Sequence, residues 1–172
     1  MKNYWVISDT HFGHHGVTKF LKSDGSKLRP YDTIEEMDDA LVDNWNSLIK
    51  PNDRVYHLGD VVINRRALPT LDRLNGKKVL IRGNHDIFRL SEYTQYFEDV
   101  RSYKILSKER IIMSHIPVHP DQLSSRWVAN VHGHLHGNIL EDQRYINVCV
   151  EQTNFKPISL DDIIDRISKL NL

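Results

Sequence analysis

Short apolar runs alternate with amphipathic stretches in the first half of the chain and follow one another closely in the second half. The runs have the length and composition of strands, whereas the stretches repeat apolar residues at helical spacing. Strands are therefore expected at 3–8, 54–58, 78–82, 100–106, 110–114, 128–132 and 145–150, and helices at 34–50, 65–75 and 160–170. This order predicts a mixed α/β fold with helices packed outside a system of sheets.

Local signals refine these expectations. Thr33 and Glu36 have the spacing of a capping box, and Pro51 closes the helix that follows them. The polar turn at 107–109 joins its two neighbouring runs into a predicted hairpin. The loop at 12–32 is long for a compact domain, and loops of that length usually carry function.

The composition limits the classes of protein. The chain has 172 residues without an internal repeat or linker, so a single domain over residues 1–172 is expected. With 23 basic and 23 acidic residues the formal net charge is zero, which disfavours tight binding to long nucleic acid.

Cys149 has no disulfide partner and is expected to be a small buried residue. No apolar stretch reaches the roughly 18 residues of a membrane span and no signal peptide precedes the first strand, so a cytoplasmic location is expected.

Seven potential metal ligands occur in five short clusters, most of them marked by a glycine. The clusters are Asp9-Thr10-His11, Gly59-Asp60, Gly83-Asn84-His85-Asp86, His115 and Gly133-His134-Leu135-His136. Each cluster follows an apolar run that is predicted to be a strand. In α/β architectures the loops that leave the carboxyl ends of strands gather at one edge, and ligands bind there. We therefore expect the clusters to form one site, although Asp9 and His136 are far apart in the sequence.

The ligand set combines three oxygen donors with four imidazoles. A closed structural zinc site uses four ligands, so this set exceeds what one tetrahedral ion needs. Two ions that share a bridging carboxylate fit better, and ions about 3.5–4 Å apart act on both oxygens of a phosphoryl displacement. The mixture of imidazole, carboxylate and amide favours Mn²⁺, Fe or Zn²⁺ over Ca²⁺ or Mg²⁺. Two divalent ions are expected, with Mn²⁺ as the first choice and Fe or Zn²⁺ as alternatives.

The order of the motifs, D-x-H, G-D, G-N-H-D, H and G-H-x-H, resembles the calcineurin-like metallophosphoesterase superfamily over residues 9 to 136. The short length and the opening I-S-D-T-H-F-G-H look like its small, single-domain microbial members. The resemblance implies a four-layer αββα sandwich, in which two mixed β-sheets are flanked by helices. It also implies a metal-dependent phosphoesterase with a dinuclear centre.

The resemblance also implies a role for each matching residue. Asp9, His11 and His136 would hold the first metal, Asn84, His115 and His134 the second, and Asp60 would bridge them. His85 takes the place of the family's general acid, which protonates the leaving oxygen, and a metal-bridging hydroxide would be the nucleophile. Asn84 would also touch an oxygen of the substrate phosphate.

The second motif departs from that of many relatives. They continue it as G-D-x-x-D-R, and the later Asp orients the catalytic His. Here that position is Ile63, so another group must orient His85. Asp86 and a backbone carbonyl are the two candidates. The departure disfavours a protein-phosphatase activity.

Two further side chains complete the expected substrate contacts. His119 stands close to the His115 cluster in the sequence, and Arg126 offers a guanidinium that matches phosphate geometry. Further candidates for a phosphate clamp are Arg65, Arg66 and Arg82.

The leading hypothesis is a phosphodiesterase that acts on a small nucleotide-like substrate. A phosphomonoesterase is the rival within the same class, because the motifs do not separate the two. A nuclease is disfavoured by the neutral charge. A non-catalytic metal-binding scaffold is disfavoured because all seven ligands and the expected acid are present.

Overall fold

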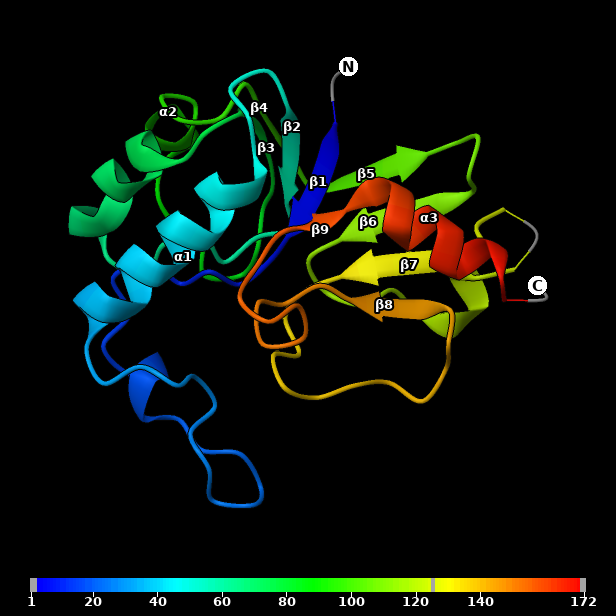
Figure 1. Ribbon diagram of the computed structural model, residues 1–172. Coiled ribbons are helices and arrows are strands. Elements are labelled where there is room, and N and C mark those ends of the chain that lie inside the picture. The colour runs from blue at the N-terminus through cyan, green and yellow to red at the C-terminus, as the bar shows by residue number, and fades with distance from the viewer. Residues whose placement is uncertain (1–2, 125, 171–172) are drawn as a thin grey trace.

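The computed structural model describes residues 3–124 and 126–170, which fold around two β-sheets. The strands are β1 (Tyr4–Ile7), β2 (Arg54–His57), β3 (Lys77–Ile81), β4 (Asp99–Arg101), β5 (Tyr103–Leu106), β6 (Ile111–Ser114), β7 (Ala129–His132), β8 (Tyr145–Asn147) and β9 (Ile158–Ser159). The first sheet has the order β4-β3-β2-β1-β9 and the second has the order β5-β6-β7-β8. Figure 1 shows the two sheets side by side.

Both sheets are mixed. In the first sheet β1 to β4 are parallel neighbours, and β9 is antiparallel to β1. In the second sheet β5 is antiparallel to β6, and β6, β7 and β8 are parallel. Two mixed sheets with helices packed against them confirm the fold class that the motifs imply.

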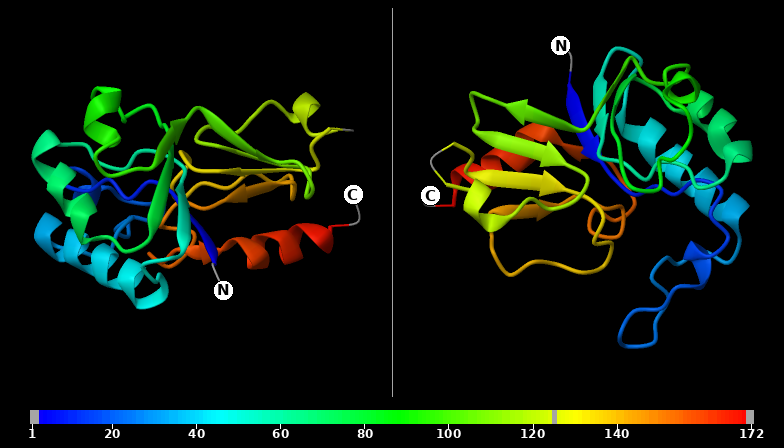
Figure 2. Two further views of the ribbon diagram at one scale, coloured as in Figure 1. Left: turned by 90° about the horizontal axis from the view of Figure 1, so that it is seen from above. Right: turned by 180° about the vertical axis from the view of Figure 1, so that it is seen from behind.

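Helices cover the outer side of the first sheet and one side of the second. The helices are α1 (Ile34–Leu48), α2 (Leu90–Tyr93) and α3 (Leu160–Ser168), with 3-10 helices η1 (Val17–Lys19), η2 (Arg65–Arg73) and η3 (Pro120–Gln122). Figure 2 shows α1 and α2 beside the first sheet, whereas α3 and the segment that carries η3 lie on opposite sides of the second. None of the helices in the described ranges is long and apolar enough to cross a membrane.

The first sheet is buried on both faces, which explains why its strands read as continuous apolar runs. Ile7 packs with Trp45 of α1 in one hydrophobic cluster. The preceding residue, Val6, points to the opposite face and packs with Met113 of β6 and Ile163 of α3. The inner cluster joins the two sheets and α3 into one core.

Helix α1 has the predicted start and ends slightly earlier than predicted. The Thr33 hydroxyl accepts a hydrogen bond from the Glu36 backbone N–H at 3.1 Å, as expected for a cap. The Glu36 carboxylate accepts from the N–H of Asp32 rather than from that of Thr33. The chain is extended again at Ile49, two residues before Pro51, and the proline disfavours a helical conformation at the intervening Lys50.

Two predicted elements differ from the observed ones. The run 100–106 was expected to be one strand, but it divides at Ser102 into β4 of the first sheet and β5 of the second. Its second part pairs with β6 as the predicted hairpin. The segment predicted as a helix at 65–75 is the 3-10 helix η2, which contains Pro69. A proline removes one helical hydrogen bond, and this favours the shorter and tighter form.

Candidate metal centre

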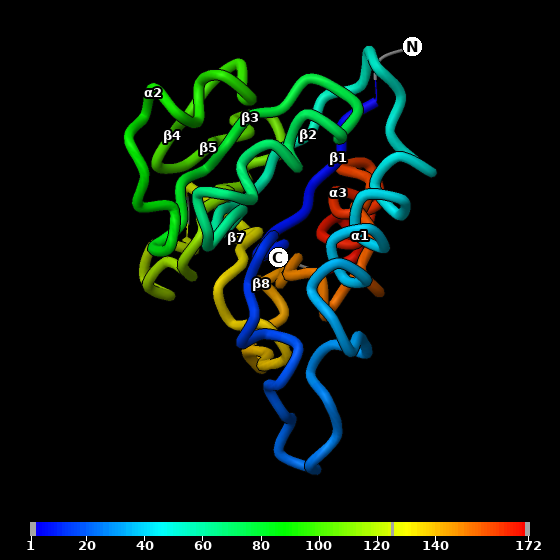
Figure 3. Tube along the Cα trace, turned by 90° about the vertical axis from the view of Figure 1, so that its left-hand side faces the viewer, coloured from blue at the N-terminus to red at the C-terminus, as the bar shows by residue number. Residues whose placement is uncertain are grey.

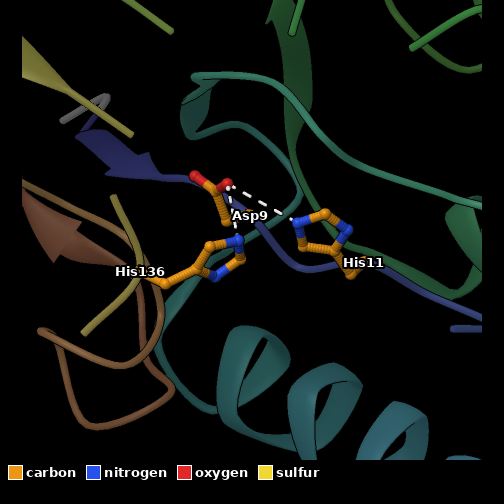
Figure 4. A group of neighbouring side chains, drawn as sticks. All are labelled: Asp9, His11 and His136. Carbon is orange, nitrogen blue, oxygen red and sulfur yellow. Dashed lines mark ion pairs between the residues drawn. The ribbon is translucent and has the colours of Figure 1, made fainter. Parts of the chain in front are cut away.

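The fold gathers six of the seven predicted ligands into two groups of three. The first group is Asp9, His11 and His136, and the second is Asp60, His115 and His134. In each group, one ligand atom from every residue lies within 4.8 Å of the others. Figure 4 shows the first group, in which both imidazoles point toward the carboxylate of Asp9.

The ligand loops meet where the two sheets join. The N–H of Asp9 donates to the carbonyl of Gly59 at 3.0 Å, which ties the loop after β1 to the loop after β2. Just before it, Ser8 forms an isolated parallel bridge with Cys149, in the segment that follows β8. This bridge connects the end of the first sheet to the second sheet. The clusters converge because parallel strands of both sheets end at this junction.

Asp60 lies between the two groups. Its Oδ2 is 3.7 Å from Nε2 of His11 and 3.5 Å from Nε2 of His115. In the first group, Oδ1 of Asp9 is 3.6 Å from Nε2 of His11 and 3.7 Å from Nε2 of His136. These distances exceed the usual 2.7–3.2 Å of a hydrogen bond. They match two ligands of one ion, because atoms about 2.1 Å from a tetrahedral metal are roughly 3.4 Å apart.

The seventh predicted ligand adjoins the second group. Oδ1 of Asn84 is 2.9 Å from Nε2 of His115. Nδ1 of His115 donates to the carbonyl of Leu58 at 2.7 Å, so Nε2 is the ring nitrogen that faces Asn84 and Asp60. The second group therefore offers two oxygen atoms and two imidazoles.

Several buried polar atoms of the first group lack a protein partner among the described residues. Oδ2 of Asp9 accepts from the Ser8 hydroxyl at 2.6 Å, the His134 N–H at 2.9 Å and the Cys149 thiol at 3.1 Å. Oδ1 of Asp9 and both ring nitrogens of His11 have no such partner. An unpaired buried polar atom is costly, and Oδ1 of Asp9 lies 3.6 Å from Nε2 of His11. A bound cation would satisfy these two atoms, so this donor set fits a metal.

The pKa values of three ligands favour the protonation states that metal binding requires, whereas hydrogen bonds with Asp60 and Glu151 raise the pKa of His115 and of His136 against the effect of burial. Burial alone would raise the pKa of Asp9, but the adjacent imidazole of His11 and the charges of His115 and His136 hold it well below its usual range. Burial lowers the pKa of His11 and of His134. An ionised carboxylate and neutral imidazoles are the forms that coordinate a cation.

A buried ion pair supports the first group from behind, and it was not recognised in the sequence. Arg29 is fully buried, and its guanidinium donates to the carbonyls of Asp9 and Thr10 at 2.5 and 2.8 Å. It also donates to the Glu151 carboxylate at 2.8 Å. The same carboxylate accepts from Nδ1 of His136 at 3.0 Å, which directs Nε2 toward Asp9.

The backbone is strained at five of the proposed ligands. Asp9, His11, Asp60, His134 and His136 have φ angles of 59°, 52°, 53°, 71° and 49°. Such left-handed conformations are uncommon outside glycine, and strain of this kind concentrates at functional sites. The glycines of the clusters permit close approach, since a Cβ at Gly83 would lie 2.3 Å from Oδ1 of Asp60.

His85 is exposed beside the centre. Its ring contacts that of His11, with the centroids 5.8 Å apart, and its N–H donates to Oδ1 of Asp60 at 2.8 Å.

The hypothesis that Asp86 orients His85 is wrong. The Asp86 carboxylate accepts from the N–H groups of Asp60, Val61 and Gly83 at 2.8–3.0 Å, so it joins two ligand loops instead.

A second histidine close to the centre is His14. Its ring lies 5.6 Å from that of His11 and 5.8 Å from that of Phe20, measured between centroids. Burial, together with the nearby His11 and Arg29, lowers its pKa to about 4. His14 is therefore neutral at ordinary pH.

The structure does not bring the other two expected substrate contacts to the ligand groups. The exposed His119 caps η3 and accepts from the N–H of Asp121 at 3.3 Å. The guanidinium of Arg126 lies over the ring of Trp127, 5.5 Å from the ring centroid. Both residues stay predictions as substrate contacts.

Residues 2–166 match the calcineurin-like phosphoesterase family, and the chain belongs to that family. It is therefore a metal-dependent phosphoesterase. An uncharacterized protein of Methanocaldococcus jannaschii is 35% identical over 98% of this chain and 93% of its own length. The gene 66 protein of Mycobacterium phage L5 is 25% identical over 99% of this chain and 97% of its own.

The fold also resembles a solved structure. A protein of unknown function from Aquifex aeolicus aligns with a TM-score of 0.73 and 28% identity. The alignment covers 96% of this chain and 99% of that protein. The similarity therefore extends over nearly the whole chain and is not confined to the motifs.

Proposed function

We propose that this protein is a phosphodiesterase that acts on a small, nucleotide-like substrate with two divalent ions, Mn²⁺ being the preferred metal. Asp9, His11 and His136 hold one ion, Asn84, His115 and His134 hold the other, and Asp60 bridges them. The two groups of ligand atoms, with Asp60 3.5–3.7 Å from an imidazole of each, support this assignment. The bound ions supply Lewis acidity and lower the pKa of water, which is how such centres activate a nucleophile.

The chain's own residues orient the phosphate and handle the leaving group. Asn84 turns its Oδ1 toward His115, so its amide NH₂ is available to donate to a phosphate oxygen. His85 is the general acid, because its exposed ring stands next to the centre and its main chain is fixed by the hydrogen bond to Asp60. We propose that it gives its proton to the leaving oxygen.

The observation that favours a diester is a pair of cavities that share walls with the centre. One cavity, of about 380 Å³, is lined by Asn84, His115 and Ile116 among others. The other, of about 510 Å³, is lined by His134 and His136 together with the segment from Phe20. A phosphodiester carries an organic group on either side of the phosphorus, and two cavities can receive both.

The partners of two of the candidate arginines also favour a diester over a monoester. A monoester carries a further negative charge, which free guanidinium groups recognise well. Arg65 pairs instead with Glu92 at 2.9 Å, and Arg82 donates to the carbonyls of Asp86 and Phe88. These two candidates for a phosphate clamp thus stabilise the fold of their own loops.

The first test compares two substrates with the same leaving group. Bis-p-nitrophenyl phosphate and p-nitrophenyl phosphate are assayed with the protein loaded with Mn²⁺, and the ratio of their kcat/KM values is measured. We expect the diester to be preferred. A strong preference for the monoester would replace the proposal with a phosphomonoesterase. Asp60→Asn serves as the inactive control, because it weakens the shared ligand without changing its size.

The second test concerns His85. His85→Ala is compared with the native protein on a p-nitrophenyl diester and on an alkyl diester, whose leaving group is much more basic. Loss of a general acid costs about 10²–10⁴-fold, and the loss is concentrated on the substrate that needs the proton. Equal losses on both substrates, or loss of bound metal from the variant, would exclude this role.

A further inference from the structure

The segment 20–28 forms a projecting hairpin, which we call the 20–28 hairpin. Leu21 and Lys27 form an antiparallel bridge, and the N–H of Leu28 donates to the carbonyl of Phe20 at 2.7 Å. Asp24 stabilises the tip by accepting from the N–H of Ser26 at 2.9 Å. Figures 1 and 3 show that the hairpin extends away from the rest of the chain.

The hairpin projects from a fixed base. Val17 and Thr18, just before it, are buried, and Arg29, just after it, is fully buried in the ion pair behind the metal ligands. The position of the hairpin is therefore set by the same residues that position the centre. A segment anchored in this way can serve as a wall of the site.

The hairpin presents apolar side chains to solvent at the place where a cavity opens. Phe20 is 48% exposed and Leu21 63% exposed. Both line the cavity of about 510 Å³, which the ligand residues His134 and His136 also line. A molecule in this cavity would touch the hairpin and the metal centre at once. The volume is in the range of sites for small organic ligands.

The ring of His14 links the cavity to the centre. It lies between the rings of Phe20 and His11, and its Nδ1 is buried without a protein partner in the described ranges. Polar side chains at the hairpin end of the cavity, Lys22 and Asp24, offer a donor and an acceptor. The cavity thus combines an aromatic face with hydrogen-bonding groups.

We infer that this cavity binds a heteroaromatic base of the substrate, with Phe20 as the surface on which the base stacks. The inference rests on the proposed phosphodiesterase function and assigns one of the two organic groups of the diester to the 20–28 hairpin. A nucleobase has a flat apolar face and a polar edge, which match the two kinds of group in the cavity. The metal ligands that line the same cavity place the attached phosphate at the centre.

The test measures how much a base on the substrate increases kcat/KM, and not the absolute rate of hydrolysis. The ratio of kcat/KM for thymidine 5′-p-nitrophenyl phosphate to that for methyl p-nitrophenyl phosphate is determined for the native protein and for Phe20→Ala. Both substrates release p-nitrophenol, so the ratio reports the nucleoside. Removing a stacking ring is expected to lower the ratio about 5- to 150-fold, because only the nucleoside substrate carries a base that stacks.

Two variants serve as controls. Phe20→Tyr keeps the aromatic face and should keep the ratio. Tyr103→Ala removes an exposed aromatic ring, 54% exposed, from β5 and should leave the ratio unchanged. A second readout is the binding of adenosine 5′-monophosphate by calorimetry, which should weaken in Phe20→Ala by a similar factor.

The outcomes separate the two proposals. An unchanged ratio and unchanged nucleotide binding in Phe20→Ala would overturn the base subsite and leave the phosphodiesterase intact. A native protein that hydrolyses neither diester with Mn²⁺ would overturn the phosphodiesterase itself.

Discussion

The buried Arg29–Glu151 pair makes the sharpest prediction about stability. The Arg29→Met variant keeps the length of the side chain but removes its charge. It leaves the Glu151 carboxylate, whose side chain is 3% exposed, without its guanidinium partner. It also removes the donors to the carbonyls of Asp9 and Thr10.

The expected cost follows from this geometry. Removing one partner of a buried ion pair costs about 3–5 kcal/mol, because the remaining charge stays out of water. For a chain of this length, about 2–4 °C of Tm is lost per kcal/mol, so the drop is about 6–20 °C. Urea unfolding and thermal unfolding of the metal-free protein measure it without a contribution from bound ions.

Two further variants complete the experiment. Arg73→Met removes an exposed pair with Asp39 and should cost about 1 kcal/mol or less. Arg29→Met combined with Glu151→Leu should recover part of the loss, because no charge is then left buried. A loss in Arg29→Met no larger than that in Arg73→Met would refute the reasoning, as would a double variant less stable than the single one.

Three other predictions concern the metal and pH. Glu151→Gln should weaken metal affinity about 10–100-fold, measured by competition with a chelator, because the ligand imidazole loses a charged support. Gly83→Ala should also release metal while the protein stays folded by circular dichroism, because the new Cβ would lie 2.3 Å from Oδ1 of Asp60. Burial raises the pKa of Asp38 to about 6 from 3.8, against the opposing hydrogen bond from Gly13. The folded state therefore binds this proton more readily than the unfolded state, and stability falls as pH rises from about 4 to 6. Relative to Asp38→Asn, the native protein should lose stability over that window in urea unfolding, and parallel profiles would contradict the assignment.

Local patterns predicted much of the secondary structure. The start of α1 follows from a hydroxyl that caps it, and its end follows from Pro51, and both are interactions between near neighbours. The apolar runs predicted strands because a sheet that is buried on both faces requires them. The ligand clusters could also be recognised in the sequence, since glycines stand next to several of them. The order of these motifs indicated the family.

Contacts between distant residues were decided by the tertiary structure alone. The run 100–106 has one continuous apolar pattern, yet its first part pairs in one sheet and its second part in the other. The chain divides at Ser102 because the two parts pack against different strands, which the local pattern does not show. Arg29 and Glu151 have no signature of their own, since a charged residue in a polar loop usually remains in water. They are buried only because the junction of the sheets encloses them. The sequence by itself determined which side chains could bind metal, and packing at that junction determined their distances, their strained backbone and their support.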